Sequence, residues 1–102
     1  MKYEIIHRPS YSMVNIQLES GEAIKAEAGA MVSMSSNIEI QTETGGLLGA
    51  VKRSMLGGES VFLNTFRSQG RGEIQLAPSY PGDVEVIETH ETVYAQSGSF
   101  MA

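Results

Sequence analysis

The sequence predicts an all-β protein, an antiparallel β-sandwich or a double-stranded β-helix-like barrel with one short helix near residues 47–56. Three observations predict this class. Apolar and polar residues alternate with period two along most of the chain, which is typical of strands. Turn-forming residues separate these runs in the segments ESGE, EAGA, SSN, SQGRG and PSYPGD. Only the stretch around residues 47–56 departs from the alternation.

The elements follow from this pattern in chain order. We expect strands at residues 2–6, 12–18, 22–27, 30–34, 37–42, 60–67, 72–77, 83–88 and 92–96. In the second of these, Val14, Ile16 and Leu18 share one face, and in the fifth, Ile38 and Ile40 point inward. Short strands at such regular spacing favour an antiparallel sandwich or barrel.

The run 60–67 is apolar on both faces, with Val61 and Leu63 on one side and Phe62 and Phe66 on the other. Such a strand is expected to be central and covered on both sides. Asn64 and Thr65 lie in the middle of the run. Because buried polar groups are nearly always hydrogen-bonded, we expect both to be paired within the fold rather than to line a pocket.

Residues 47–56 have helical spacing. The side chains of Leu47, Leu48, Val51 and Met55 fall within about 100° of helical arc, whereas Lys52 and Arg53 lie outside it. Paired glycines precede and follow the segment, and Gly57-Gly58 suits a left-handed helix stop. The candidate contacts with a partner or a membrane are Leu47, Leu48, Lys52, Arg53, Met55 and Leu56.

Three interpretations fit the glycine-bracketed segment to different degrees. A phosphate-binding loop requires a lysine and a hydroxyl directly after the last glycine, but Glu59 and Ser60 follow here. A membrane-surface helix would suit the leucines and the two cations. A helix that covers the open end of the sandwich is the commoner use of an amphipathic segment. The sequence favours this covering role over the membrane surface.

The chain contains an internal echo. Residues 22–33 align without a gap with residues 91–102, placing Glu22 on Glu91, Ala26 on Ala95 and Gly29 on Gly98. A repeated strand, glycine turn and strand indicates a duplicated unit. We therefore expect residues 1–102 to be a single β domain. Either it is the N-terminal half of a longer duplicated architecture, or oligomerisation supplies the missing half.

Composition excludes several functions. The 102 residues carry 12 acidic and 7 basic side chains, a formal net charge of −5 that repels nucleic acids, so no nucleic-acid partner is expected. The absence of cysteine excludes disulfides and thiolate metal sites. Glu4 and His7 interrupt the N-terminal apolar stretch, and no apolar run approaches about 18 residues. We expect a cytoplasmic protein.

Catalytic motifs are lacking. No glycine–serine–glycine elbow precedes a helix, and the two histidines, His7 and His90, are not in a ligand-spaced cluster. We therefore expect no catalytic residues, no metal and no cofactor. If both histidines converged with a glutamate, a two-histidine, one-carboxylate centre would become possible, and this alternative stays open.

The segments GEAIKAEAGAMVSMSSNIEIQT, GGLLGAVKRSMLGGESVFLNTF and IQLAPSYPGDVEVIE resemble a family of uncharacterised bacterial and archaeal proteins. Its relatives include a yeast protein named for altered inheritance of mitochondria. The family is grouped by fold with the tryptophan RNA-binding attenuator protein. The resemblance covers nearly the whole chain, and it implies an all-β, sandwich-like fold, usually over a longer chain, without established enzymatic activity. RNA binding by the fold relative does not transfer, because fold alone does not imply function.

The expected function is a non-enzymatic, β-rich assembly or binding module that forms a homo-oligomer. Its expected partner is a protein or a peripheral membrane surface, contacted through residues 47–56. The alternative is a small-ligand or metal-dependent β-barrel enzyme that uses His7 and His90.

Overall fold

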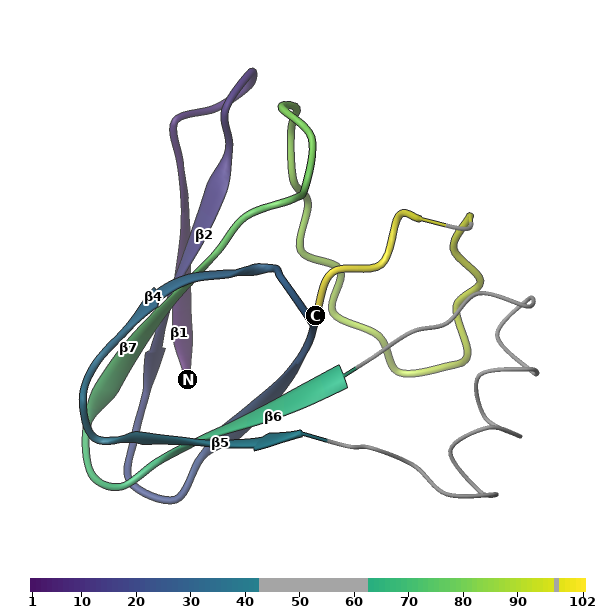
Figure 1. Cartoon of the computed structure of the whole chain (residues 1–102). Coiled ribbons are helices and arrows are strands. Elements are labelled where there is room, and N and C mark those ends of the chain that lie inside the picture. Colours follow the sequence, from purple (N-terminus) through teal and green to yellow (C-terminus); the bar gives the residue numbers. More distant parts are fainter. Residues whose placement is uncertain (43–62, 97) are drawn as a thin grey trace.

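The computed structural model describes residues 1–42, 63–96 and 98–102. The described part is all-β, with strands arranged in two antiparallel sheets, as the alternation predicted (Figure 1). The expected helix at 47–56, with every contact residue assigned to it, lies outside these ranges.

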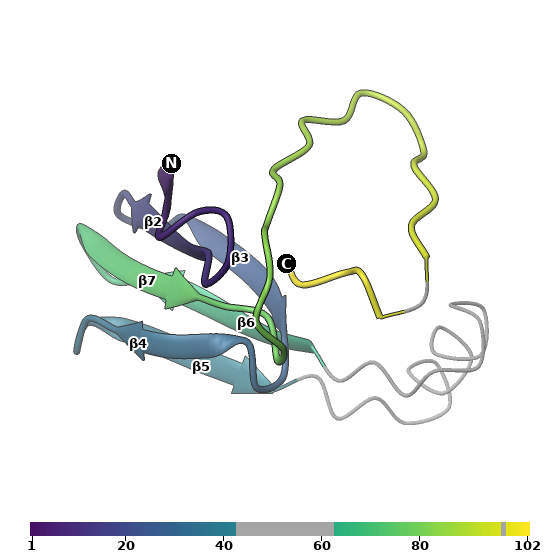
Figure 2. The same ribbon diagram turned by 90° about the horizontal axis from the view of Figure 1, so that it is seen from above.

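The larger sheet has the order β1–β2–β7–β4, and the smaller has the order β3–β6–β5. The bounds are β1 Lys2–Ile6, β2 Met13–Leu18, β3 Ala23–Glu27, β4 Met31–Met34, β5 Ile38–Thr42, β6 Leu63–Ser68 and β7 Gly72–Leu76. The first seven expected strands are thus confirmed within the described residues. The short turns after β2, β3, β4 and β6 each carry the chain from one sheet to the other, so the sheets form sandwich-like layers (Figure 2).

The core lies between the layers and follows the alternation. Val14, Ile16 and Leu18 of β2 are buried, while the residues between them point outward. The other buried apolar residues are Ala26, Ala30, Ile38, Phe66, Ile74 and Leu76. Each strand therefore contributes one face to the core, because successive side chains of a strand alternate between the two faces of its sheet.

β6 is the central strand of the smaller sheet, as expected for an apolar run. Its Phe66 pairs with Ile24 on one side and with Ile40 on the other, which forms one row across the core-facing side. Phe66 is 1% exposed. On the opposite face, Leu63 is half-buried and Arg67 is exposed, so the expected cover on that face is only partial.

The expected strands at 83–88 and 92–96 are wrong. Both segments lack strand structure, although Val84 and Val86 still pack against the core and Glu85 between them is exposed. The alternation that predicted these strands is present. A strand also needs a neighbour to receive its backbone hydrogen bonds, and the described residues provide none.

Candidate interaction surfaces

Within the described residues, the outer edge of β5 is unpaired, and we call it the free edge. β5 pairs with β6 along one side, in a regular antiparallel register from Ile38 to Thr42. Along the other side, no strand among the described residues pairs with it. An unpaired edge presents a row of backbone N–H and C=O groups that another strand can bind.

Ile40 makes this edge apolar. Its side chain lies on the core-facing side of the sheet, in the same row as Phe66, yet it is 44% exposed. Ile38, on the same face of the same strand, is 5% exposed, so the uncovered apolar surface lies at the Ile40 end of the β5 edge. A core-facing isoleucine left uncovered at a free edge marks a place where a further strand would bury apolar surface.

The neighbouring edge strand, β4, is protected. Its pairing with β7 is shifted between Met31 and Ser33, which places a bulge at Val32. Bulges twist an edge away from regular pairing and are a common protection against strand addition. Of the two edges on this side of the sandwich, β5 is therefore the better acceptor of another strand.

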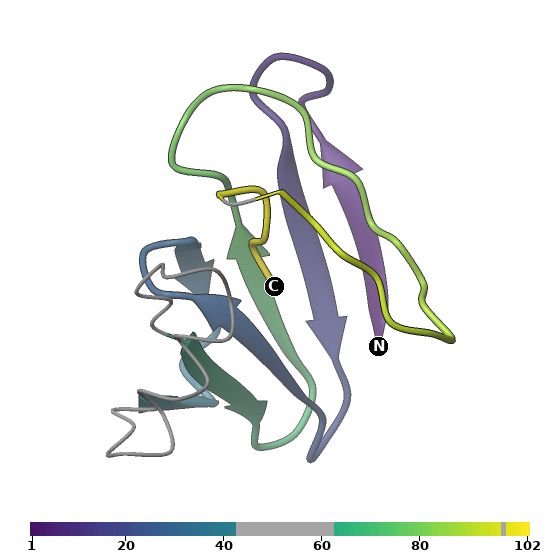
Figure 3. The ribbon, with the colours of Figure 1, turned by 90° about the vertical axis from the view of Figure 1, so that its right-hand side faces the viewer.

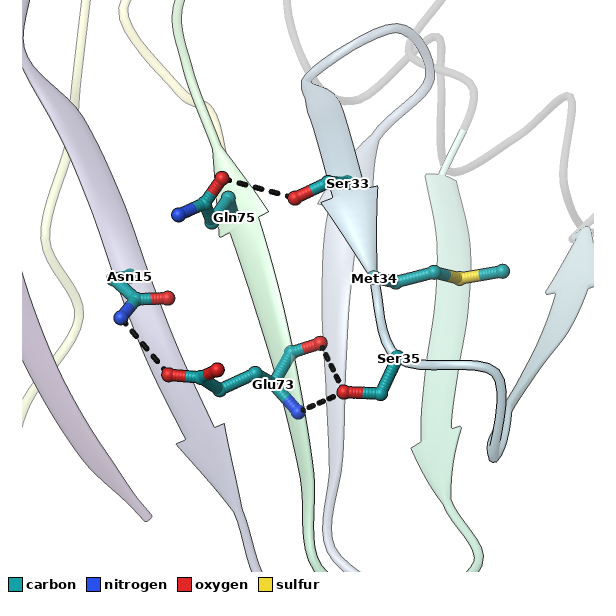
Figure 4. A pocket seen from close by; sticks show the side chains of 6 residues that line it. All are labelled: Asn15, Ser33, Met34, Ser35, Glu73 and Gln75. Carbon is teal, nitrogen blue, oxygen red and sulfur yellow. Dashed lines mark hydrogen bonds between the residues drawn. The ribbon is translucent and has the colours of Figure 1, made fainter.

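A polar hollow of about 240 Å³ lies on the solvent face of the larger sheet (Figure 4). Asn15 Nδ2 donates to Glu73 Oε1 at 3.1 Å, and Ser33 Oγ donates to Gln75 Oε1 at 2.9 Å. Ser35 Oγ accepts from the Glu73 backbone N–H at 2.8 Å. Most of these groups bind one another, although Asn15 Oδ1 is buried without a hydrogen-bond partner in the described part of the molecule. The polar groups of the hollow are thus mostly occupied by hydrogen bonds to one another.

A cluster of charged groups attaches the C-terminal segment to the loop between β1 and β2. Arg8 binds Asp83 through two hydrogen bonds of 3.0 Å, from Nε and from Nη2, and reaches Glu85 Oε2 at 3.3 Å. Ser12 Oγ donates to Asp83 Oδ1 at 2.6 Å, and the Ser12 N–H donates to the Gly82 carbonyl at 3.0 Å. We call this set of residues the Arg8 clamp.

The clamp alters the acidity of its members. Hydrogen bonds from Arg8, then from Ser12 and the Val84 N–H, lower the pKa of Asp83 from its ordinary 3.8 to about 2. The pKa of the Arg8 guanidinium is raised by its hydrogen bonds to Asp83 and Glu85. Both shifts favour the ion pair, so the clamp is charged at neutral pH.

The two histidines do not form a site in the described structure. His7 is exposed in the loop after β1, at a left-handed backbone angle φ of 61°, and His90 is exposed in the C-terminal segment. Among residues 1–42, 63–96 and 98–102, no group of three or more histidine, aspartate or glutamate side chains is placed to hold a metal ion. The described geometry therefore assembles no two-histidine, one-carboxylate centre.

Sequence reasoning missed the Arg8 clamp and the exposure of Ile40. Arg8 and Asp83 are 75 residues apart, and nothing local to either residue indicates the other. Ile40 was expected to point inward, and it does. Its exposure depends on which residues of the folded chain pack against that end of β5, a long-range property.

The described residues form two antiparallel sheets, and this architecture defines the chain as a small, sandwich-like β module. A comparison with protein-family models matches residues 3–102 to the family described as mitochondrial biogenesis AIM24. The chain belongs to this family, which confirms the resemblance seen in the sequence.

Two relatives come from Streptococcus pyogenes. An uncharacterized protein of serotype M6 is 34% identical over 110 residues, covering 100% of this chain and 44% of the relative. The crystal structure of another S. pyogenes protein, a structural genomics target, matches with a TM-score of 0.59 and 35% identity, covering 78% of this chain and 38% of that one. This chain therefore spans less than half of the length of either relative.

No helix among the described residues is long and apolar enough to cross a membrane.

Proposed function

We propose that this chain is a non-enzymatic β module that associates with further copies of itself through the free edge of β5. The main support is the exposure of Ile40, a core-facing side chain that is 44% exposed beside a strand edge that is unpaired within the described residues. A strand added at this edge would satisfy free backbone groups and bury apolar surface at once. Its place in the cytoplasm, expected from the sequence, is part of the proposal.

Light scattering of the purified chain tests the proposal. The wild type is expected to show a mass above that of the 11.0 kDa monomer, increasing with concentration. Ile40→Lys places a charge at the edge, a device that natural sheets use against pairing, and is expected to give a monomer.

Tyr80→Lys is the matched control, because Tyr80 is also an exposed, large apolar residue but lies in the turn after β7. The control is expected to associate like the wild type. A wild type that stays monomeric at high concentration, or an Ile40→Lys variant that associates normally, would overturn the proposal.

The proposed partner contacts are those expected from the sequence, at Leu47, Leu48, Lys52, Arg53, Met55 and Leu56, all outside the described residues. Leucines beside two cations support binding to an anionic membrane surface or to a protein of similar character. In a sedimentation assay with anionic vesicles, the wild type is expected to pellet with the lipid, and the double variant Leu48→Asp, Lys52→Glu to stay in solution. A wild type that does not bind the vesicles excludes the membrane as this partner.

A further inference from the structure

We propose that an extended run within residues 85–95 of one copy adds as a strand to the free edge of β5 in a second copy. This inference rests on the proposed self-association and names the segment that would form the contact. It also predicts that the association is head-to-tail, because the donating segment and the accepting edge are different surfaces.

The donor segment begins with the alternation of a strand, bends at His90 and Glu91, and has no strand partner in the described structure. Val84 and Val86 face the core while Glu85 and Ile87 are exposed, which is the alternation of a strand. No backbone–backbone hydrogen bond joins residues 85–95 to any other described residue. Its exposed apolar side chains include Ile87 at 66% and Tyr94 at 93%.

The internal repeat of residues 22–33 at residues 91–102 also indicates that residues 92–96 can form a strand. The Ala30 N–H donates to the Glu27 carbonyl at 3.0 Å in the turn between β3 and β4. At the aligned positions, the Ser99 N–H donates to the Gln96 carbonyl, also at 3.0 Å. Gly29 and Gly98 have similar left-handed φ angles, 90° and 80°. The residues before the first turn form β3 inside a sheet, whereas the corresponding residues 92–96 have the same kind of turn and no sheet.

The segment cannot reach the β5 edge of its own chain without detaching. At one end, the Arg8 clamp and the Gly82 carbonyl bind it to the loop after β1. At the other end, the Met101 carbonyl accepts from the Glu27 N–H at 2.8 Å. Between these two attachments the segment lies on the side of β1, away from β4 and β5 (Figures 2 and 3).

A second copy removes this difficulty. It can present its β5 edge to the segment while both attachments remain in place. Because the donor segment and the acceptor edge lie on different sides of one molecule, each copy can bind one neighbour through its donor and a second through its acceptor. Such a heterologous contact does not end at a dimer, and it continues until a ring closes or a filament forms.

Mixing two variants tests this arrangement, one without a working donor segment and the other without a working acceptor edge. The donor variant is Ile87→Pro with Val93→Pro, which removes two backbone N–H groups that the described fold does not use. The acceptor variant is Ile40→Lys. Ile87→Ala with Val93→Ala is the control, because alanine keeps the backbone donors. Masses are measured by light scattering in about 0.15 M salt. This salt concentration weakens the repulsion between Glu39 on β5 and the glutamates of residues 85–95.

Each variant alone is expected to be monomeric, and a single cooperative thermal unfolding transition is the check of folding. Their mixture is expected to form a 1:1 dimer and nothing larger, since one intact donor meets one intact acceptor. The alanine control is expected to associate more strongly than the proline variant.

A proline variant that associates like the wild type would overturn this inference and leave the proposed function standing. Two monomeric variants that fail to combine would also overturn it, because a head-to-tail contact must be complemented. A monomeric wild type would remove the proposed function together with the inference.

Discussion

At the scale of single residues, the Arg8 clamp shows how a few polar contacts position a segment that has no strand partner in the described fold. Asp83 accepts hydrogen bonds from Arg8, from Ser12 and from the Val84 N–H. Its carboxylate therefore joins the C-terminal segment to the loop after β1. A charge-assisted, two-pronged Arg–Asp pair fixes orientation more strictly than a single hydrogen bond would.

The lowered pKa of Asp83 predicts a defined loss of stability in acid. Because the folded pKa is about 2 and the ordinary value is 3.8, the clamp stabilises the fold fully above pH 3.8. This contribution is lost as the pH falls from 3.8 toward 2. In urea titrations, Asp83→Asn is expected to be less stable than the wild type at pH 7, with the difference vanishing near pH 2. A difference that stays constant across this range would contradict the assignment.

Phe66 predicts the largest loss from one core substitution. Its ring is buried between two neighbouring strands, so Phe66→Ala is expected to cost about 3 to 5 kcal/mol of unfolding free energy. Ile40→Ala, in the same row but at the open edge, is expected to cost about 1 kcal/mol. Denaturant unfolding at low protein concentration measures both. Equal losses of unfolding free energy for the two variants would contradict the prediction, because they would show that Ile40 is as well covered as Phe66.

At the scale of elements, turns decide where each strand ends and which sheet the next strand joins. Gly29 adopts φ 90° between β3 and β4, a conformation that is costly for residues with a Cβ atom. A Cβ atom at Gly29 would meet no atom within 4 Å, so any penalty there comes from the backbone alone. The glycine is thus needed for its backbone angle rather than for close packing.

Gly29→Ala is expected to lower the unfolding free energy by about 1 to 2 kcal/mol. Gly82 is the matched control, since a Cβ atom there also meets no neighbour and its φ is not in the left-handed region. Gly82→Ala is expected to change stability by less than about 0.5 kcal/mol. Thermal unfolding of both variants compares them directly, and a similar loss in the two would count against the role of the turn.

At the scale of the whole molecule, the two sides of the sandwich differ. One side ends in a bulged β4 and a free β5, and the other carries the C-terminal segment beside β1 (Figure 3). The proposed strand acceptor lies on the first side and the proposed strand donor on the second. It is the physical basis of the proposed head-to-tail assembly.

Self-association predicts that thermal stability depends on protein concentration. Anything that binds the folded chain but not the unfolded chain raises Tm by mass action, and here the ligand is another copy. The Tm of the wild type is expected to rise over a hundredfold increase in concentration, whereas that of Ile40→Lys stays constant. Calorimetry at several concentrations measures this, and a constant wild-type Tm would argue for a monomer.

The sequence by itself determined the class of fold, the first seven strands of the described part and part of the core. Val14, Ile16 and Leu18 were recognisable because alternation is a local property of a strand, readable wherever one face is buried. The turn glycines were recognisable for a similar reason, since the demand for a left-handed φ is met within a few residues.

Tertiary structure alone decided which strands find neighbours. Residues 83–88 have the same alternation as β2, yet the described fold places no strand beside them. The pairing of Arg8 with Asp83 and the exposure of Ile40 were likewise unreadable from local pattern. All three depend on contacts between residues far apart in the chain, and a period-two pattern records which face of a strand is apolar, not what lies against its edge.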